Sequence, residues 1–242
     1  MNELKLNNKR TILVGLAFLS ICSFWQMYDN LIPLILRRTF ALDESLTGMI
    51  MAADNVLALF LLPLFGGLSD RCRPGKLGRR TPYILAGTAG AVVLMNLLPM
   101  LDNSYFKQAA PFKLVSFVIV LGLLLIAMGT YRSPAVALMP DVTPKPLRSK
   151  GNAIINLMGA VGGVLYLGIS VLLYPREKTQ GLVHVDYQPL FFIVSMIMLV
   201  AVAALLLTIR EPKLVEENRE LEKKHPEWNL AKDDGSGGEV LP

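Results

Sequence analysis

The sequence has few charged residues and very few cysteines or histidines. Asp, Glu, Lys and Arg make up 18% of its 242 residues, and 53% of the residues are hydrophobic, whereas a soluble domain has about 25% charged residues. The two cysteines cannot form a disulfide scaffold, so both are expected to be free thiols. The two histidines belong to no His pair, no metal-ligand spacing and no Ser/His/Asp set. We therefore expect neither an enzyme nor a metal or cofactor site.

Long apolar stretches are abundant instead. A run of about 20 apolar residues crosses the hydrocarbon of a bilayer, and six such runs leave too little chain for a soluble core. The predicted fold class is an all-α polytopic membrane protein with six transmembrane helices, at 11–36, 45–69, 82–101, 112–140, 148–174 and 188–209. Residues 1–10 would form an N-terminal segment, 11–209 the bundle, and 210–242 a charged tail. A short helix at 212–226 and a flexible Gly-Ser-Gly-Gly linker are expected in that tail.

The basic residues predict how the bundle sits in its membrane, most simply the plasma membrane. With the N-terminus in the cytoplasm, the short inner segments hold eleven basic residues and the outer loops hold six. Because Lys and Arg near helix ends stay on the cytoplasmic side, both termini are expected in the cytoplasm. The net charge of +5 then reflects these loops, and it indicates a lipid bilayer rather than a nucleic acid as partner.

Three ionisable residues interrupt the apolar runs: Asp29, Asp54 and Arg132. At 1.5 Å per residue, each lies roughly 12–15 Å from the nearer surface, so the three could converge near the midplane. Charges inside a membrane usually mark a transport or proton pathway. Arg132 would pair with one deprotonated acid, and the other acid would bind a proton. The alternative interpretation is a structural ion pair that holds helices together.

Polar and aromatic residues accompany these charges. We expect the pathway to include Gln26, Tyr28, Asn30, Asn55 and Tyr131. Amide groups and aromatic faces suit a neutral, hydroxyl-rich solute such as a sugar. The alternatives are hydrogen bonds between helices, worth about 0.6 kcal/mol each, or, for Tyr28, an anchor in the membrane interface.

The segment from Gly66 to Pro82 has the most informative pattern. It contains Gly-x-Leu-x-Asp-Arg, ending at Asp70 and Arg71, and then Gly-Arg-Arg at residues 78–80. Asp70 could bind Arg79 or Arg80 and form a cytoplasmic gate, although a plain positively charged loop would have a similar composition. The pattern resembles the signature loop of the major facilitator superfamily.

Other stretches are similar to the sucrose–proton symporters and the glycoside–pentoside–hexuronide:cation symporters in that superfamily. They are Tyr28-Asp29-Asn30, Asp54-Asn55, and the region from Tyr131 to Asp141 with Arg148 to Ala153. The resemblance implies a solute:cation symporter that works by alternating access, with twelve helices in two halves. This chain would supply the first half, and a second six-helix half would lie in a missing part or in another chain.

The sequence and this resemblance also give expectations about symmetry and the coupling ion. Tyr28-Asp29 before Pro33 and Tyr131-Arg132 before Pro134 fit two inverted three-helix repeats. Melibiose-type relatives have a second acid one turn after the first on helix two, where this chain has Ala58, so a proton is favoured over sodium. A non-transporting sensor or regulatory protein, or a degenerate fragment, remains the alternative function.

Overall fold

The computed structural model describes residues 6–73, 75 and 77–229. These residues form helices and no β-strand. The helices are α1 (Asn8–Arg38), α2 (Glu44–Arg71), α3 (Thr81–Lys107), α4 (Pro111–Val142), α5 (Arg148–Leu173), α6 (Arg176–Thr179), α7 (Gln188–Thr208) and α8 (Glu211–Lys224), with 3-10 turns at Lys145–Leu147 and Pro226–Asn229. The six long helices α1 to α5 and α7 are each long and apolar enough to cross a membrane. The predicted all-α membrane fold is confirmed.

The helices begin where the sequence provides local start signals. The side chains of Asn7 and Asp43 accept hydrogen bonds from the first turns of α1 and α2, at 3.1 and 2.8 Å. Proline occupies the first positions of α3, α4, α7 and α8, where its missing N–H removes no helical hydrogen bond.

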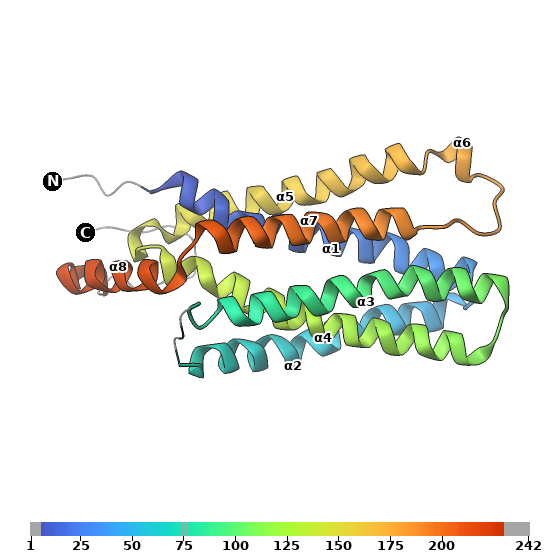
Figure 1. The fold of residues 1–242 in the computed structure, drawn as a ribbon, viewed down its shortest axis with the longest axis horizontal. Helices are drawn as coiled ribbons and strands as arrows, with labels where there is room; N and C mark the ends of the chain where they lie inside the picture. The colour runs from blue at the N-terminus through green and yellow to red at the C-terminus, as the bar shows by residue number, and fades with distance from the viewer. Residues whose placement is uncertain (1–5, 74, 76, 230–242) are drawn as a thin grey trace.

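The packing of the helices follows a twofold pattern (Figure 1). Helix α1 packs against α5 and α7, while α4 packs against α2 and α3, and α3 lies against α7. The contacts of α1 with α5 and α7 thus correspond to those of α4 with α2 and α3. This pairing fits the inverted repeat of two three-helix units. The start of α1 and all of α8 lie at one end of the bundle, here called the proximal end, and α6 lies at the other, the distal end.

Glycines allow the closest contacts between these helices. A Cβ at Gly162 of α5 would overlap the backbone of Leu19 on α1, and one at Gly87 of α3 would lie 2.6 Å from the backbone nitrogen of Tyr131 on α4. Gly159 and Gly163 face Cys22 and Gln26 on α1. Small residues therefore let backbones approach within this chain.

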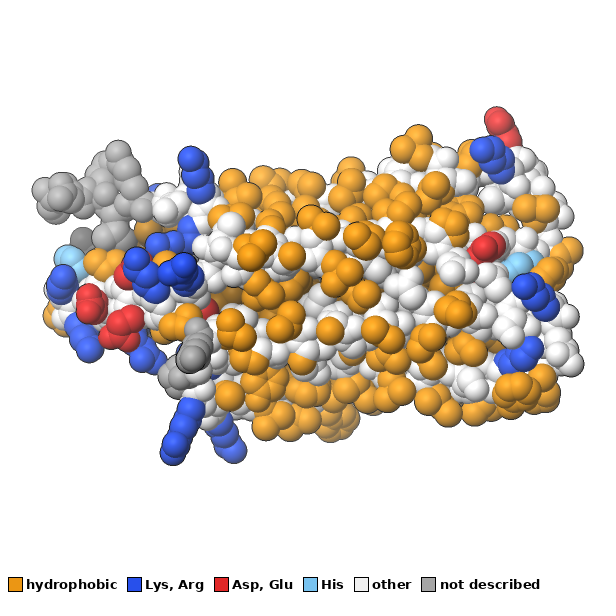
Figure 2. All heavy atoms as spheres, in the orientation of Figure 1, with side chains coloured by type: hydrophobic (Ala, Val, Ile, Leu, Met, Phe, Trp, Pro, Cys, Tyr) orange, Lys and Arg blue, Asp and Glu red, His pale blue; other side chains and the backbone are white. Residues whose placement is uncertain are grey.

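The surface has an apolar middle and two charged ends (Figure 2). Hydrophobic side chains cover the middle of the visible face, and charged side chains gather at the two ends. Large apolar residues such as Leu59 (70% exposed) and Phe60 (66%) on α2 and Val164 (70%) on α5 face outward. So large an exposed apolar surface is stable only against lipid or another protein.

Some helix boundaries differ from the predicted ones. The third helix continues to Lys107, six residues beyond the predicted end at Leu101, because an apolar run marks the hydrocarbon-spanning part and a helix can continue past it. The tail helix predicted at 212–226 is present as α8. The Gly-Ser-Gly-Gly stretch lies outside the described residues.

Candidate functional site

The two intramembrane acids lie near each other on neighbouring helices. Asp29 and Asn30 are exposed on α1, and Asp54 is half-buried on α2 beside the exposed Asn55. The charge of Asp54 acts on Asp29. Two carboxylates that interact through space repel each other when both are ionised.

Arg132 lies in the same region, but it contacts an aromatic ring rather than a carboxylate. Its guanidinium carbon is 5.5 Å from the centre of the Trp25 ring, within the range of a cation–π interaction. Among the described residues it has no ion pair with an acid. Arg132, Trp25 and Asp54 nevertheless line one cavity between α1, α2 and α4, of about 20 Å³, which is enough for a water molecule.

Polar atoms of the aromatic residues beside this cavity have no partner. Phe24, Trp25 and Tyr28 form a cluster on α1, with ring centres of Trp25 and Tyr28 5.4 Å apart. Within the described part of the chain, the indole nitrogen of Trp25 and the hydroxyl of Tyr28 are buried without a hydrogen bond. Buried polar groups normally have partners, so these atoms are candidates for contact with a solute. We call Trp25, Tyr28, Asp29, Asp54 and Arg132 the central cluster.

The amide side chains predicted for the pathway bond locally. The Asn30 amide donates to the Gln26 carbonyl one turn earlier (2.6 Å), and the Asn55 amide donates to the Asp54 carboxylate (2.9 Å). Gln26 also lies against Gly163 of α5. Asn30 and Asn55 thus border the central cluster on its exposed side.

Among the predicted pathway residues, Asp54 and Arg132 line the cavity, and Tyr131 lies away from it in the core. It is fully buried, and its hydroxyl lies 2.7 Å from Ser20 Oγ and donates to the Ala17 carbonyl at 3.1 Å. Tyr131 therefore attaches α4 to the core side of α1 and does not reach the cavity. Its neighbour in sequence, Arg132, points to a different side because successive helical residues are about 100° apart.

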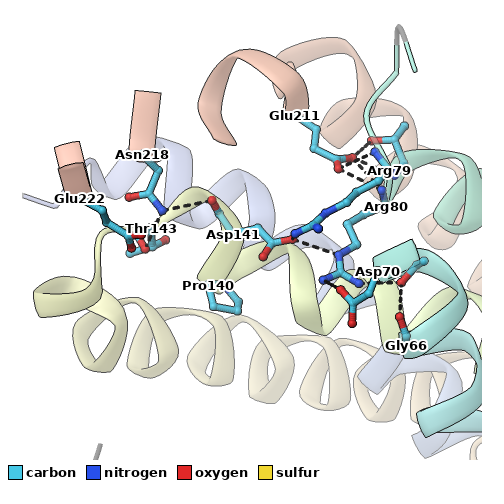
Figure 3. Close-up of polar contacts among 12 residues, drawn as sticks. Gly66, Asp70, Arg79, Arg80, Pro140, Asp141, Thr143, Glu211, Asn218 and Glu222 are labelled. Carbon is cyan, nitrogen blue, oxygen red and sulfur yellow. Dashed lines mark hydrogen bonds and ion pairs between the residues drawn. The ribbon is translucent and has the colours of Figure 1, made fainter. Parts of the chain in front are cut away.

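At the proximal end, Arg80 joins three segments (Figure 3). It forms ion pairs with Asp70 at the end of α2 (2.5 Å) and with Asp141 on α4 (3.0 Å), and it donates to Ser69 at 2.6 Å. Its side chain is only 5% exposed. This contact matches the predicted pairing of Asp70 with one of the two arginines. We call Asp70, Arg79, Arg80, Asp141 and Glu211 the proximal clasp.

The other basic residues of the predicted gate behave differently. Arg79 pairs with Asp141 at 3.1 Å rather than with Asp70. Arg71 is exposed and lies outside the clasp. Because Arg79 and Arg80 share Asp141, the clasp connects α2 and α3 to α4.

Glu211, the first residue of α8, completes the clasp. Its carboxylate accepts hydrogen bonds from the backbone N–H groups of Arg79, Arg80 and Thr81 at 2.8–2.9 Å, and from the Thr81 hydroxyl at 2.8 Å. These N–H groups lie at and just before the first residue of α3, so Glu211, which is distant in the sequence, caps that helix. Gly78 has φ +96°, and a Cβ there would overlap the Glu211 carboxylate. Only glycine fits this position.

Further contacts hold α8 against the bundle. Glu217 pairs with Arg10 at 3.3 Å, and Glu222 pairs with Arg148 at 3.4 Å. The Asn218 amide donates to the carbonyls of Asp141 and Thr143, at 3.2 and 3.4 Å. Helix α8 therefore links the proximal ends of α1, α3, α4 and α5.

Sequence reasoning missed Asp141 and Glu211 as members of the clasp. Asp141 has a weak signal, since it is an acid at the end of an apolar run. Glu211 directly precedes Pro212, which is a typical helix start, but nothing in the sequence shows that its carboxylate caps α3. In the described residues, no group of three or more His, Cys, Asp or Glu side chains could hold a metal ion.

Several characterised proteins are similar to this chain. It is 27% identical over 186 residues to human solute carrier family 45 member 3, and the aligned region covers 75% of this chain and 33% of the human protein. It is 29% identical over 140 residues to sucrose transport protein SUC3 of Arabidopsis thaliana, which covers 53% of the chain and 23% of the plant protein. The sucrose transport protein SUT4 of Oryza sativa is 30% identical over 140 residues, and this alignment covers 53% of the chain and 23% of the rice protein.

These relatives are much longer than the chain, which spans about a third or less of their length. No solved structure matches the chain significantly. The profile of the Major Facilitator Superfamily matches residues 14–234, nearly the whole described region. Together with the six apolar helices and the resemblance of residues 66–80 to the superfamily's signature loop, this match shows that the chain is an integral multi-pass membrane protein that belongs to the major facilitator superfamily.

Proposed function

We propose that this chain is the N-terminal half of a secondary active transporter that moves a sugar or glycoside together with a proton by alternating access. The observation that supports this function best is the central cluster. Asp54, Arg132 and Trp25 line one cavity among otherwise apolar helices, and Tyr28 and Asp29 lie near them on α1. Such groups are costly inside a membrane, so they are rarely retained without a role in transport.

The chemistry of this cluster suits a neutral, hydroxyl-rich solute. Trp25 offers an aromatic face, Asn30 and Asn55 offer amide groups at the exposed edge, and the Tyr28 hydroxyl has no hydrogen-bond partner in the described part of the chain. Two of the similar proteins are named as sucrose transport proteins, which supports a sugar as the solute class.

A proton is the favoured coupling ion. Asp29 and Asp54 repel each other, while Arg132 is held over Trp25 and forms an ion pair with neither acid. Ala58, one turn after Asp54, lines the cavity where a second carboxylate would be needed for a paired sodium site. One of the two acids would therefore bind a proton, and Arg132 would compensate the other when the solute leaves.

A second six-helix half would complete the pathway. Helix α2 is largely exposed, with Thr47 and Ser69 as its buried residues, and the central cluster lies along it. A second bundle on this side would enclose the cavity between two halves. The proximal clasp would then act as the gate on the cytoplasmic side, with both ends of this chain in the cytoplasm of a cell whose plasma membrane contains the transporter.

The test is uptake by the complete transporter in proteoliposomes. An imposed proton gradient should drive the accumulation of radiolabelled sucrose or another glycoside. Asp54→Asn should abolish this uphill uptake because the amide cannot release a proton, while exchange of solute across the membrane can persist. Asp43→Asn is the matched control, because Asp43 only caps α2 and Asn caps helices equally well.

The same assay shows which of the two acids carries the proton. Unaltered uphill uptake in Asp54→Asn would exclude Asp54 as the proton carrier, and Asp29→Asn then tests the other acid. If both variants accumulate solute like the unchanged protein, proton coupling through the central cluster is wrong. If the unchanged protein transports no solute and binds none, the non-transporting alternative is correct.

A further inference from the structure

A groove between α1 and α7 lies outside both the central cluster and the proximal clasp. Apolar side chains of the two helices border it, among them Leu16 of α1 and Val200 and Ala204 of α7, and its volume is about 350 Å³. Ala201 and Ala204 have the smallest side chains at its border, so the space opens where larger residues would fill it. Val200 is 63% exposed. The described residues therefore leave room here for an apolar occupant.

The groove faces away from the central cluster. Leu16 and Trp25 are nine residues apart on α1, and at about 100° per residue they point to opposite sides of the helix. Lys9 is seven residues before Leu16, almost two full turns, so it lies on the groove side. Helix α7 packs mainly against α1 and α3, and α2 packs mainly against α4. A second six-helix half placed along α2 would therefore leave the groove open to lipid.

The groove has the length of one leaflet of a bilayer. On α7 it runs from Ala204 to Ile193, and at 1.5 Å per residue these eleven steps span about 16 Å. The hydrocarbon of a bilayer is about 30 Å thick, so one leaflet is about half of that. Ala204 lies one helical turn before Thr208, the last residue of α7 at the proximal end. An acyl chain that enters from the proximal surface would therefore fit along the groove.

Exposed basic residues stand at the proximal ends of both helices. Lys9 lies in the first turn of α1, and Arg210 lies just after α7. Among the described residues, neither has an ion pair, whereas their neighbours Arg10 and Lys213 share Glu217 at 3.3 and 3.9 Å. Figure 2 shows Lys and Arg side chains at this end, next to the apolar middle. Two cations thus remain available to a negatively charged group at the membrane surface.

We propose that the groove binds an acyl chain of an anionic phospholipid whose headgroup phosphate is bound by Lys9 and Arg210. The apolar border fits the chain, and the two basic residues fit the headgroup. A neutral phospholipid would fill the groove equally well, but its headgroup has no net charge to offer the two cations. A second copy of this chain, or another apolar helix, would cover the groove and leave both cations unpaired.

The first experiment tests the headgroup. Melting temperatures of the chain in a neutral detergent are measured while dioleoylphosphatidylglycerol or dioleoylphosphatidylcholine is added, because a ligand of the folded state raises the melting temperature according to its affinity. Phosphatidylglycerol should bind more tightly, although the acyl chains are the same. Lys9→Gln and Arg210→Gln should each weaken its binding about fivefold and leave phosphatidylcholine unaffected. Arg71→Gln, an exposed proximal change on α2, is the matched control and should change neither affinity.

The second experiment tests the groove. Ala204→Leu fills it, so native mass spectrometry should detect one bound phosphatidylglycerol fewer than in the unchanged chain. Ala203→Leu adds the same side chain at an exposed position outside the groove and should retain the lipid. The melting temperature of each variant without added lipid shows whether it is folded.

Three results would overturn the proposal. Equal affinities of the unchanged chain for the two phospholipids would mean that lipid contact here is unspecific. Unchanged phosphatidylglycerol binding in both Lys9→Gln and Arg210→Gln would remove the headgroup site. A dimer in light scattering that Ala204→Leu converts to a monomer would identify a second copy as the occupant. Neither experiment measures transport, so the proposed transport function stands or falls separately.

Discussion

Arg80 shows how a charged residue is accommodated at the edge of an apolar bundle. Its guanidinium is almost fully buried and lies between the carboxylates of Asp70 and Asp141. A buried charge is tolerated when each of its hydrogen-bonding groups has a partner, and removal of one partner costs about 3–5 kcal/mol. The geometry of Arg80 therefore depends on acids from two other helices.

Replacement of Gly78 tests how much its fit against Glu211 contributes to the stability of the fold. Gly78→Ala requires a side chain at φ +96°, which costs about 1–2 kcal/mol, and the new Cβ overlaps the Glu211 carboxylate. We expect a lower melting temperature and a loss of at least this free energy of unfolding. Thermal unfolding in detergent measures both.

The control for this substitution is Gly75→Ala, in the same loop, where a Cβ would meet no atom within 4 Å. It should change the melting temperature little. If Gly78→Ala costs as much in a Glu211→Ala background as alone, the overlap with Glu211 has no part in the effect, and backbone strain explains it.

At the scale of elements, α8 is a connector between helices that are far apart in the sequence. Its first residue caps α3, and later residues bind α1, α4 and α5. Surface ion pairs such as Arg10–Glu217 contribute little, about 0–1 kcal/mol each. The buried carboxylate of Glu211 has multiple charge-assisted hydrogen bonds, so most of the attachment should come from this residue.

Glu211→Gln tests whether this residue provides most of the attachment of α8. The amide keeps the shape but offers one acceptor atom instead of two and has no charge to place at the start of α3. We expect the free energy of unfolding to fall by about 1–2 kcal/mol. Glu216→Gln, an exposed change on the same helix, should have almost no effect, and equal losses in the two variants would show that α8 is held by its surface charges.

The elements themselves could be predicted from the sequence, because a membrane span needs a long apolar run and few local sequences satisfy that need. The loop from Gly66 to Pro82 also indicated that Asp70 would bind Arg79 or Arg80, and the structure shows the contact with Arg80. The partners from other helices could not be predicted in the same way. Asp141 and Glu211 reach the clasp through the packing of α4 and α8, and Trp25 competes with the acids for Arg132; these outcomes depend on tertiary contacts that no local pattern encodes.

On the scale of the whole molecule, the apolar middle and charged ends divide the surface into zones that match a bilayer. The basic residues gather at the proximal end, which is therefore the end expected in the cytoplasm. Cys72, the residue after α2, is exposed at this end, whereas Cys22 lies half-buried within α1.

This orientation can be measured by labelling cysteine. In a Cys22→Ser variant, a membrane-impermeant maleimide should label Cys72 in inside-out vesicles and leave it unlabelled in intact cells. A Cys72→Ser variant, which retains the half-buried Cys22, serves as the background control. Strong labelling of Cys72 in intact cells would place the proximal end outside and reverse the proposed topology.

The cap that Glu211 places on α3 also sets an order for biosynthesis. Glu211 follows Thr81 by 130 residues, so the ribosome releases it only after all six spans have been synthesised. Until then, the first amide groups of the third span have to be hydrated or satisfied by other partners. The nascent chain can thus insert its helices one after another, but the proximal end is held together only when α8 has been translated.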